Sequence, residues 1–191
     1  LRLVKQSKGV KALRRTSSSL KICEKVFEYY DSSDLFHKIQ WYTGDVNDIA
    51  SLENGMQGCD FLLHCAAIVS FDPSDRSLLQ KVNIEGTANV MNVALDLGIK
   101  KAGFVSSIAA LDTTFGNELI NETAFFQVNK IASTYSLSKY FSEQEVWRIA
   151  AEGLDVIIVN PSVILGPGDW KKGSSQIFQK IFKGLNFYTT G

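Results

Sequence analysis

The amino-acid sequence predicts an α/β protein built on a doubly wound parallel sheet. Short runs that are apolar at almost every position, such as residues 61–67 and 155–160, alternate with longer segments whose apolar residues recur every three or four positions. Strands of this kind are typical of parallel sheets, because βαβ crossovers place helices on both faces. The chain has 191 residues, 45% of them hydrophobic, which is enough for one well-packed core and too few for two large ones.

The first half of the chain alternates strands with short helices. Residues 8–13 predict a short strand that the chain enters through Gly9, and a polar basic loop follows it. Helical spacing of apolar residues then predicts a helix over 20–30, which the polar residues 31–34 end. Residues 39–42 predict the next strand, and Asp48 is expected to cap a helix that runs to Met56.

The second half repeats the alternation with longer helices. After strand 61–67, a helix is expected over 75–97, ended by Gly98. Strands are expected at 104–107 and 155–160, on either side of a helix over 132–151, and a turn and a short amphipathic helix over 174–183 close the chain. The residues expected on the inner side of helix 75–97 are Leu78, Leu79, Val82, Val90, Met91, Ala94 and Leu95.

Charge and cysteine content narrow the function classes. Twenty basic residues balance twenty acidic ones, so no broad positive field favours nucleic acid, and a small-molecule partner is expected. Cys23, Cys59 and Cys65 lack any C-x-x-C spacing, which argues against a metal site or a disulfide framework and favours a cytoplasmic location. No apolar run approaches the roughly 18 residues of a membrane span, so no membrane partner is expected.

Tyr135 and Lys139 are the candidate catalytic pair. Four residues apart on a helix, a phenol and an ammonium lie on the same face. A nearby cation favours the phenolate, which would make the tyrosine usable as a general acid or base. The motif Y-x-x-x-K occurs by chance on surface helices, so its meaning depends on its surroundings.

Ser106 and Ser107 supply those surroundings. They end a predicted buried strand, so their hydroxyls should lie at the carboxyl edge of the sheet, where open α/β sheets bind ligands. A serine there could donate a hydrogen bond to a carbonyl oxygen as negative charge develops on it. The alternative is that the two serines merely terminate the strand.

Taken in order, these segments resemble the extended short-chain dehydrogenases/reductases, the NAD-dependent epimerase/dehydratase group. That resemblance implies a Rossmann-type fold, a nicotinamide cofactor and an oxidoreductase activity. The matching segments are 60–67 (DFLLHCAA), 82–89 (VNIEGTAN), 104–107 (FVSS), 135–139 (YSLSK) and 160–169 (NPSVILGPGD).

The resemblance also implies residue roles. Tyr135 would donate the proton to the carbonyl, Lys139 would bind the nicotinamide ribose and lower the tyrosine pKa, and Ser107 would polarise the carbonyl. Asn83, an unfavourable residue inside a helix, would complete the catalytic group, and His64 is expected to be a core histidine. The residues that would border the cofactor, besides Tyr135 and Lys139, are Asp45, Val46, Cys65, Ala66, Ala67, Ser106, Pro161 and Val163. For Asp45 a turn or helix-capping role is the equal alternative.

Arg14 and Arg15 bear on the choice of cofactor. An acidic residue after the second strand of such a fold holds a free ribose hydroxyl, whereas an arginine accommodates a 2′-phosphate. Here the strand runs into two arginines, which are strong donors to phosphate. We therefore expect NADP, with NAD as the alternative and a solvated basic loop as the non-functional interpretation.

Two positions favour a reductase within this group. Nucleotide-sugar epimerases and dehydratases usually carry arginine where this chain has Asn160, and asparagine where it has Val163. Asn160-Pro161 and residues 10–15 look more like the dihydroflavonol reductase branch. We expect reduction of a ketone or aldehyde; the alternatives are a nucleotide-sugar epimerase or dehydratase and a non-catalytic cofactor sensor.

The sequence also leads to expectations about the regions beyond both ends of the chain and about the pairing of two copies. The family's glycine-rich turn is not found, so the first strand and that turn are expected upstream of Leu1, and the substrate domain beyond Gly191. Residues 1–170 are expected to form the cofactor domain and 171–191 to begin the substrate-binding region. The irregular span 112–129 would border the substrate, and two copies would pair through the helices that contain Val90 and Tyr140.

Overall fold

The computed structural model describes residues 1–6, 9–111, 121, 122, 124, 126, 132–166 and 173–184. The chain divides into two compact units. The first comprises Leu1–Ala12, Thr16–Trp41 and Val163–Gly191, and the second comprises Leu13–Arg15 and Tyr42–Ser162. The predicted domain boundary at residue 170 stays a prediction.

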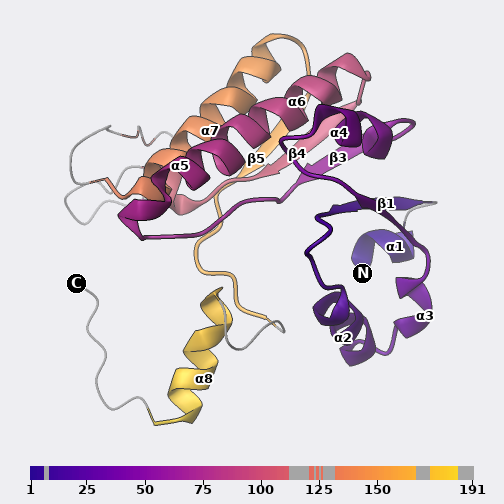
Figure 1. Cartoon of the computed structure of the whole chain (residues 1–191), viewed down its shortest axis with the longest axis vertical. Coiled ribbons are helices and arrows are strands. Elements are labelled where there is room, and N and C mark those ends of the chain that lie inside the picture. The colour runs from indigo at the N-terminus through magenta and orange to yellow at the C-terminus, as the bar shows by residue number, and fades with distance from the viewer. Residues whose placement is uncertain are drawn as a thin grey trace. The chain divides into compact units, whose positions relative to one another are not determined.

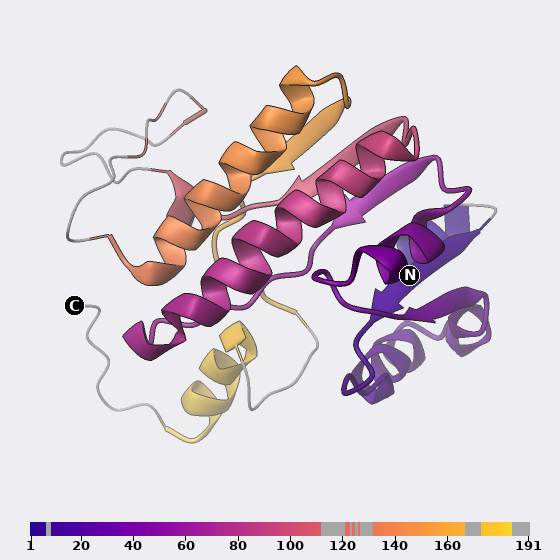
Figure 2. The same ribbon diagram turned by 45° about the horizontal axis from the view of Figure 1, so that its top comes forward.

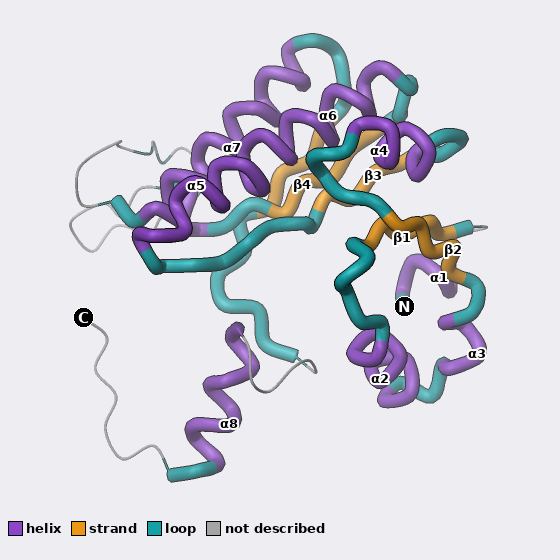
Figure 3. Tube along the Cα trace, viewed as in Figure 1, coloured by secondary structure: helices purple, strands orange, loops and turns teal. Residues whose placement is uncertain are grey.

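The first unit is mainly helical. It holds α1 (Arg2–Gln6), α2 (Lys21–Tyr29), α3 (Ser33–Phe36), η4 (Gly173–Ser175) and α8 (Gln176–Phe182). Strands β1 (Val10–Arg14) and β2 (Ile39–Thr43) pair in a two-stranded sheet, and each has its last two residues in the second unit (Figures 1 and 3). Phe27 of α2 is buried with its ring edge-to-face against Phe36, 5.5 Å between centroids, so α2 and α3 share a small aromatic core.

The second unit is built on a three-stranded parallel sheet. Its strands are β3 (Phe61–His64), β4 (Lys101–Val105) and β5 (Val156–Val159), in the order β3-β4-β5. His64 pairs with Phe104, and Val105 pairs with Val159, so the three strands end together at one edge (Figure 3). This confirms the predicted α/β fold with a parallel sheet.

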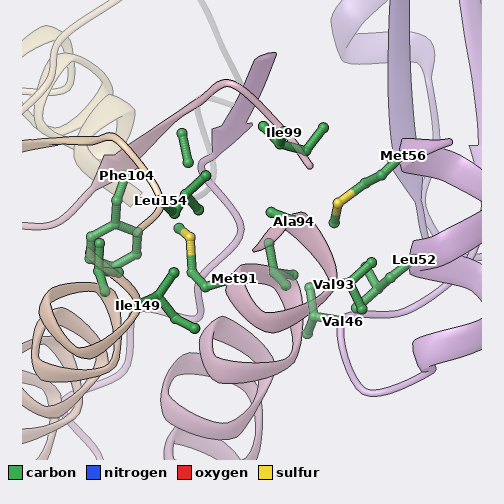
Figure 4. Packing of buried hydrophobic residues seen from close by; sticks show 13 residues of the cluster. Val46, Leu52, Met56, Met91, Val93, Ala94, Ile99, Phe104, Ile149 and Leu154 are labelled. Atoms are coloured by element: carbon green, nitrogen blue, oxygen red, sulfur yellow. The ribbon is translucent and has the colours of Figure 1, made fainter. Parts of the chain in front are cut away.

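Helices α6 (Gly86–Asp96) and α7 (Thr134–Ala151) lie side by side along one face of this sheet (Figure 2). Helix α4 (Ile49–Met56) packs on α6, and Asp48 caps it as predicted by accepting a hydrogen bond from the Ser51 backbone N–H. The core between these helices and the sheet is aliphatic except for one aromatic ring (Figure 4). Its fully buried members include Met91, Ala94, Ala102, Phe104, Val146 and Ile149.

The predicted helix 75–97 is present, but it is not a uniform α-helix. A 3-10 turn, η1 (Pro73–Asp75), leads into α5 (Arg76–Leu79), then a π-helical segment, η2 (Gln80–Glu85), and then α6. Within η2 the Gly86 N–H donates to the Lys81 carbonyl, five residues back. One prediction about this helix is wrong: Leu79 is fully buried, whereas Leu78, expected on the inner side, is 45% exposed, since neighbouring helical residues point about 100° apart and only one of the two faces the core.

The opposite face of the strands carries exposed apolar side chains. Phe61 and Leu63 of β3 are 68% and 58% exposed, while His64 points to the helical side and is buried. Alternation of side chains along a strand accounts for this pattern. The strand is apolar on both faces, as predicted, but only the face toward α6 and α7 is buried.

Within the described residues, none of the helices combines the length and apolar character that a membrane-spanning segment requires.

Candidate active site

Chemically useful side chains meet at the carboxyl edge of the β3-β4-β5 sheet. Strand β3 ends at His64, so Cys65, Ala66 and Ala67 follow it as exposed residues. Strand β4 ends at Val105, immediately before Ser106 and Ser107, and this brings both serines just beyond the edge. Helix α7 packs against the 3-10 turn η3 (Ile108–Ala110) that follows the serines. This is the edge at which open α/β sheets bind ligands.

Helix α7 begins one residue before the candidate tyrosine. Ser133 caps the helix, its hydroxyl accepting a hydrogen bond from the Ser136 N–H at 3.0 Å. Tyr135 therefore stands in the first turn, half-buried, with its ring edge against Phe71 at 5.5 Å between centroids. A cap makes the start of a helix well defined, so the position of the phenol is set by the backbone.

Lys139 lies one turn further on and is 2% exposed. Its Nζ donates a hydrogen bond to the Val105 carbonyl at 3.0 Å and stands 4.6 Å from the centre of the Phe104 ring. Burial lowers the pKa of Lys139 to about 8, and the charges of Glu143 and Cys65 act in the opposite direction. The side chain is thus a fixed cation at neutral pH, on the same helix face as Tyr135.

The two predicted serines differ in their surroundings. Ser107 caps η3, its Oγ accepting from the Ala109 N–H at 3.1 Å, and its O–H proton can still be donated to a ligand. Ser106 is 5% exposed, and among the described residues its Oγ has no hydrogen-bond partner. A buried hydroxyl without a partner is destabilising by about 1–3 kcal/mol. A polar ligand group at this edge would remove that cost.

Asn83 does not present its amide to a ligand. It lies in the π-helical segment, 1% exposed, and all its amide groups are bonded within the protein. Its Oδ1 accepts from the Ile68 N–H at 2.8 Å, and its Nδ2 donates to the Ile68 carbonyl and to Ser138 Oγ, each at 2.9 Å. Asn83 therefore joins the loop after β3 to helix α7 directly beside Lys139.

His64 is a structural histidine, as predicted from the sequence. Its Nε2 lies 2.9 Å from Thr87 Oγ1, and its ring stacks on Phe104 at 5.6 Å. Burial, helped by the Lys139 charge, lowers the pKa of His64 to about 4. It is neutral at physiological pH and does not change its charge there.

A second group of predicted cofactor residues lies where β1 and β2 end. Arg14 is the last residue of β1 and is partly buried, whereas Arg15 is exposed. The Asp45 carboxylate accepts from both the backbone N–H and the side-chain amide of Asn47, at 2.9 and 3.2 Å. This is the turn role that the sequence left open, and it does not decide whether Asp45 also meets the adenine.

Val46, Pro161 and Val163, which were also predicted to border the cofactor, lie in three different environments. Val46 is a core residue: it packs so closely on Gly86 that a Cβ there would lie 2.5 Å from Val46 Cγ2. Pro161 is half-buried, and its carbonyl accepts from the Ile108 N–H at 3.1 Å. Val163 belongs to the first compact unit and is 61% exposed. Most of the predicted substrate border, 112–129, lies outside the described residues.

Sequence reasoning missed a set of buried polar side chains on α7. Ser142 Oγ donates to the Asn83 carbonyl at 2.6 Å, and Ser138 Oγ donates to the Tyr135 carbonyl at 2.8 Å. Glu143 accepts from the Asn160 amide at 2.9 Å. The signal for the serines was available: both are on the Lys139 side of a long helix, where small polar residues otherwise favour ends and turns. The described residues hold no cluster of His, Cys, Asp and Glu that could bind a metal.

Comparison with known proteins identifies the family. A family model of the NAD-binding type, described as male sterility protein, matches residues 1–190. The chain belongs to this family. It is one of the extended short-chain dehydrogenases/reductases, so the resemblance seen in the motifs is confirmed.

Individual relatives support the same family assignment. A putative dihydroflavonol 4-reductase from Synechocystis sp. is 39% identical over 133 residues, covering 70% of the chain and 38% of the relative. Cinnamoyl-CoA reductase 1 from Petunia hybrida is 32% identical over 130 residues, covering 64% and 38%. The chain thus spans less than two fifths of the length of these curated relatives.

Solved structures confirm the fold. The crystal structure of gox2253 matches with a TM-score of 0.77 and 31% identity, over 94% of this chain and 52% of that one. The dTDP-glucose 4,6-dehydratase of Streptomyces venezuelae, solved with NAD bound, matches with a TM-score of 0.74 and 21% identity, over 92% and 53%. The second likeness concerns the fold alone.

The residues at the sheet edge fit such a cofactor. The buried, unpartnered Ser106 hydroxyl and the exposed small side chains of Ala66 and Ala67 leave polar and open surface at the point where the strands end. Lys139, a cation fixed beside them, suits a ribose hydroxyl as donor. The roles of these residues remain predictions.

Proposed function

We propose that this chain forms part of a reductase that converts a ketone or aldehyde to an alcohol with NADP. The observation that carries the proposal is the buried Lys139 cation one helical turn from the capped Tyr135, at the carboxyl edge of the sheet. Its relatives named dihydroflavonol 4-reductase and cinnamoyl-CoA reductase support a reductase over an epimerase. Asn160, in place of an arginine, supports the same choice.

Each residue has a defined task in this proposal. When bound, NADPH would supply the hydride that adds to the carbonyl carbon. Tyr135 gives its phenolic proton to the carbonyl oxygen, so that hydride and proton together yield the alcohol. Ser107 donates a hydrogen bond to the same oxygen as charge develops on it. Lys139 binds the nicotinamide ribose and favours the phenolate that Tyr135 becomes.

Arg14 and Arg15 are proposed to select NADP. Arg14 is the last residue of β1 and Arg15 follows it directly; Arg15 is exposed, so its guanidinium can reach a ligand phosphate. Hydrogen bonds to a charged group contribute about 1.5–3 kcal/mol. The Arg15→Ala variant should therefore lose preference for NADPH over NADH by on the order of tenfold. An unchanged ratio of kcat/KM for the two cofactors would assign the choice elsewhere.

The proposed reaction is tested by following NADPH and NADH oxidation by the full-length protein. The panel should contain simple ketones and aldehydes, a dihydroflavonol and cinnamoyl-CoA, since relatives are named for the last two. Tyr135→Phe should lower kcat by on the order of a hundredfold or more, because it removes the general acid. Tyr140→Phe is the matched control, since it removes a hydroxyl from the same helix.

Specific outcomes would contradict the reductase proposal. Cofactor binding without oxidation on any carbonyl would overturn the reductase. Turnover of a nucleotide sugar with tightly retained NAD would then support the epimerase, and binding without any turnover would support the cofactor sensor. Equal losses in Tyr135→Phe and Tyr140→Phe would remove Tyr135 from the mechanism.

Assembly and location are secondary proposals. The cysteines Cys23, Cys59 and Cys65 are free thiols, which supports the cytoplasm. Pairing of two copies through α6 and α7 would use surface residues such as Phe141 and Trp147, because Val90 itself is buried in the core of its own chain. Sedimentation of the full-length protein, compared with a Trp147→Glu variant, tests the pairing.

A further inference from the structure

The end of β5 carries an amide that joins two parts of the site. Asn160 follows the last residue of β5, and its Nδ2 donates to the Ser107 carbonyl at 3.1 Å and to Glu143 Oε2 at 2.9 Å. An amide nitrogen has two protons, so each acceptor can receive one. Asn160 therefore bridges the candidate catalytic serine and helix α7.

This bridge closes a ring of contacts. Helix α7 is tied to the end of β4 at Val105 by the Lys139 ammonium, at 3.0 Å. One helical turn further along, Glu143 ties the same helix through Asn160 to Ser107, two residues beyond Val105. Two ties at successive turns restrict rotation of the helix about its axis. They set the direction of Tyr135 relative to the Ser107 hydroxyl.

The backbone around the ring is also paired. Beyond the ends of β4 and β5, the Ser106 N–H donates to the Val159 carbonyl at 2.8 Å, and the Ile108 N–H donates to the Pro161 carbonyl at 3.1 Å. Both segments joined by Asn160 thus continue their pairing past the regular sheet. A bridge built on such a backbone transmits position with little slack.

We propose that Glu143 and Asn160 are positioning residues of this site: Asn160 holds Ser107 against helix α7, and the Glu143 carboxylate provides the negative charge that keeps Lys139 a cation. The proposal rests on the reductase function proposed above. It assigns neither residue a contact with substrate, so both act through Ser107 and Lys139.

The charges around Lys139 support the second half of the proposal. The groups that face its ammonium are His64 and Cys65 from β3 and its end, the Phe104 ring and Val105 carbonyl from β4, and Glu143 from α7. Burial lowers the pKa of Lys139, and Glu143 is the larger of the two influences that raise it. His64 is neutral, and partial desolvation raises the pKa of the Cys65 thiol; Glu143 is the carboxylate among these groups.

Two variants separate the two halves of the proposal. Glu143→Gln removes the charge and keeps an oxygen that can accept from Asn160. Asn160→Ala removes the bridge and keeps the charge. Glu145→Gln is the matched control, because Glu145 is on the same helix and pairs with the partly exposed Arg148 at 3.0 Å.

The effect of the Glu143 charge on Lys139 can be measured without any enzymatic turnover. NMR of ¹³C-lysine-labelled full-length protein, with the Lys139 signal assigned by Lys139→Arg, reports the titration midpoint of Lys139 directly. We expect this midpoint to fall in Glu143→Gln and to stay in place in Glu145→Gln. The alkaline limb of the kcat profile should move to lower pH in the same variant. An unmoved Lys139 midpoint in Glu143→Gln overturns the electrostatic role, whatever the enzyme's substrate proves to be.

The bridge is tested by kinetics. Misplacement of a reacting group by about 1 Å can lower the rate on the order of a hundredfold, so Asn160→Ala should lower kcat at least tenfold while cofactor Kd changes little. Asn160→Ser, which keeps a short donor, should recover part of the loss. A kcat equal to that of wild type in a folded Asn160→Ala protein overturns the bridge. Because the lysine titration needs no substrate, failure of the reductase proposal would be recognised separately.

Discussion

The two halves of helix α7 bury different kinds of side chain. The N-terminal half buries polar groups: Ser138, Lys139 and Ser142 are 3% exposed or less. The C-terminal half buries Val146 and Ile149, both fully. One continuous helix thus changes from a polar interior to an apolar one within two turns.

In the polar half every buried polar group needs a hydrogen-bond partner, whereas in the apolar half the side chains only have to pack in the core without gaps. A buried hydroxyl or ammonium without a partner is destabilising, and each of the three polar side chains is hydrogen-bonded. The outer surface of the apolar half carries the Arg148 ion pairs, which are partly exposed. The difference indicates that position is specified at the start of α7 and stability at its end.

The largest loss of stability is expected from the apolar half. Ile149→Ala should reduce the free energy of unfolding by about 2–5 kcal/mol, because it removes buried methyl groups and leaves a cavity. Urea unfolding followed by circular dichroism measures this. Ile149→Val, as the matched control, should lose only about 1 kcal/mol. Equal losses in the two variants would mean that this end of the helix can relax around the gap.

A slightly smaller loss is expected for Asn83, the partner of the polar half. Asn83→Ala leaves the Ile68 backbone groups and Ser138 without their hydrogen-bond partner. Each buried polar group left without a partner lowers the free energy of unfolding by about 1–3 kcal/mol, and by less where water can replace the partner. A loss of about 2–4 kcal/mol is expected by the same measurement. Asn92→Ala, at the helix surface, should change stability little. A loss below that of the Asn92 variant would show that Asn83 is not a clamp.

The Lys139 charge should make stability depend on pH. Its pKa is about 8 in the folded protein and 10.5 ordinarily, so between these values the unfolded chain binds a proton that the folded chain lacks. Stability therefore rises as pH rises from 8 to 10.5, by about 3 kcal/mol from this group. Lys139→Met should lose that rise, and its advantage over wild type should be greatest below pH 8. Parallel pH profiles for the two proteins would contradict a depressed pKa.

The smallest effect is expected at the surface of the apolar half. Arg148→Ala removes ion pairs with Glu145 and Glu152, at 3.0 and 2.6 Å, that are partly exposed and screened by solvent. We expect a loss below about 1 kcal/mol, smaller still at high salt. A loss as large as that of Ile149→Ala would show that the C-terminal half of α7 depends on charge as well as on packing.

The sequence predicted most of the fold because its signals are local. Apolar periodicity, the Asp48 cap and Gly98 placed the helices, and Gly98 adopts the positive φ, 67°, that ends a helix in this way. The Leu78 error arose because Leu78 and Leu79 are adjacent and point about 100° apart on a helix, so only one of them faces the core. The π-helical segment Gln80–Glu85 was not predicted, because apolar periodicity assumes a constant rotation per residue.

The candidate site was predicted in part, for a related reason. Tyr135 and Lys139 are recognisable by spacing within one helix, and Ser106 and Ser107 by their place after a strand. The links between elements were not readable, because Asn160 meets Glu143 across 17 positions and Asn83 meets Ser138 across 55. For Asn83 the sequence indicated a hydrogen-bonding role but could not show that the partners belong to the protein.

The π-helical segment Gln80–Glu85 has a consequence for insertions and deletions. Removing one residue there would restore ordinary α-helical winding and leave α5 nearly in phase with α6, because six π-helical residues rotate through about the same angle as five α-helical ones. Leu79 would then stay in the core, whereas Asn83, inside the segment, would change its direction relative to Ile68. A homologue with a single-residue gap in an alignment between 80 and 85 would have to hold the loop after β3 by some other means.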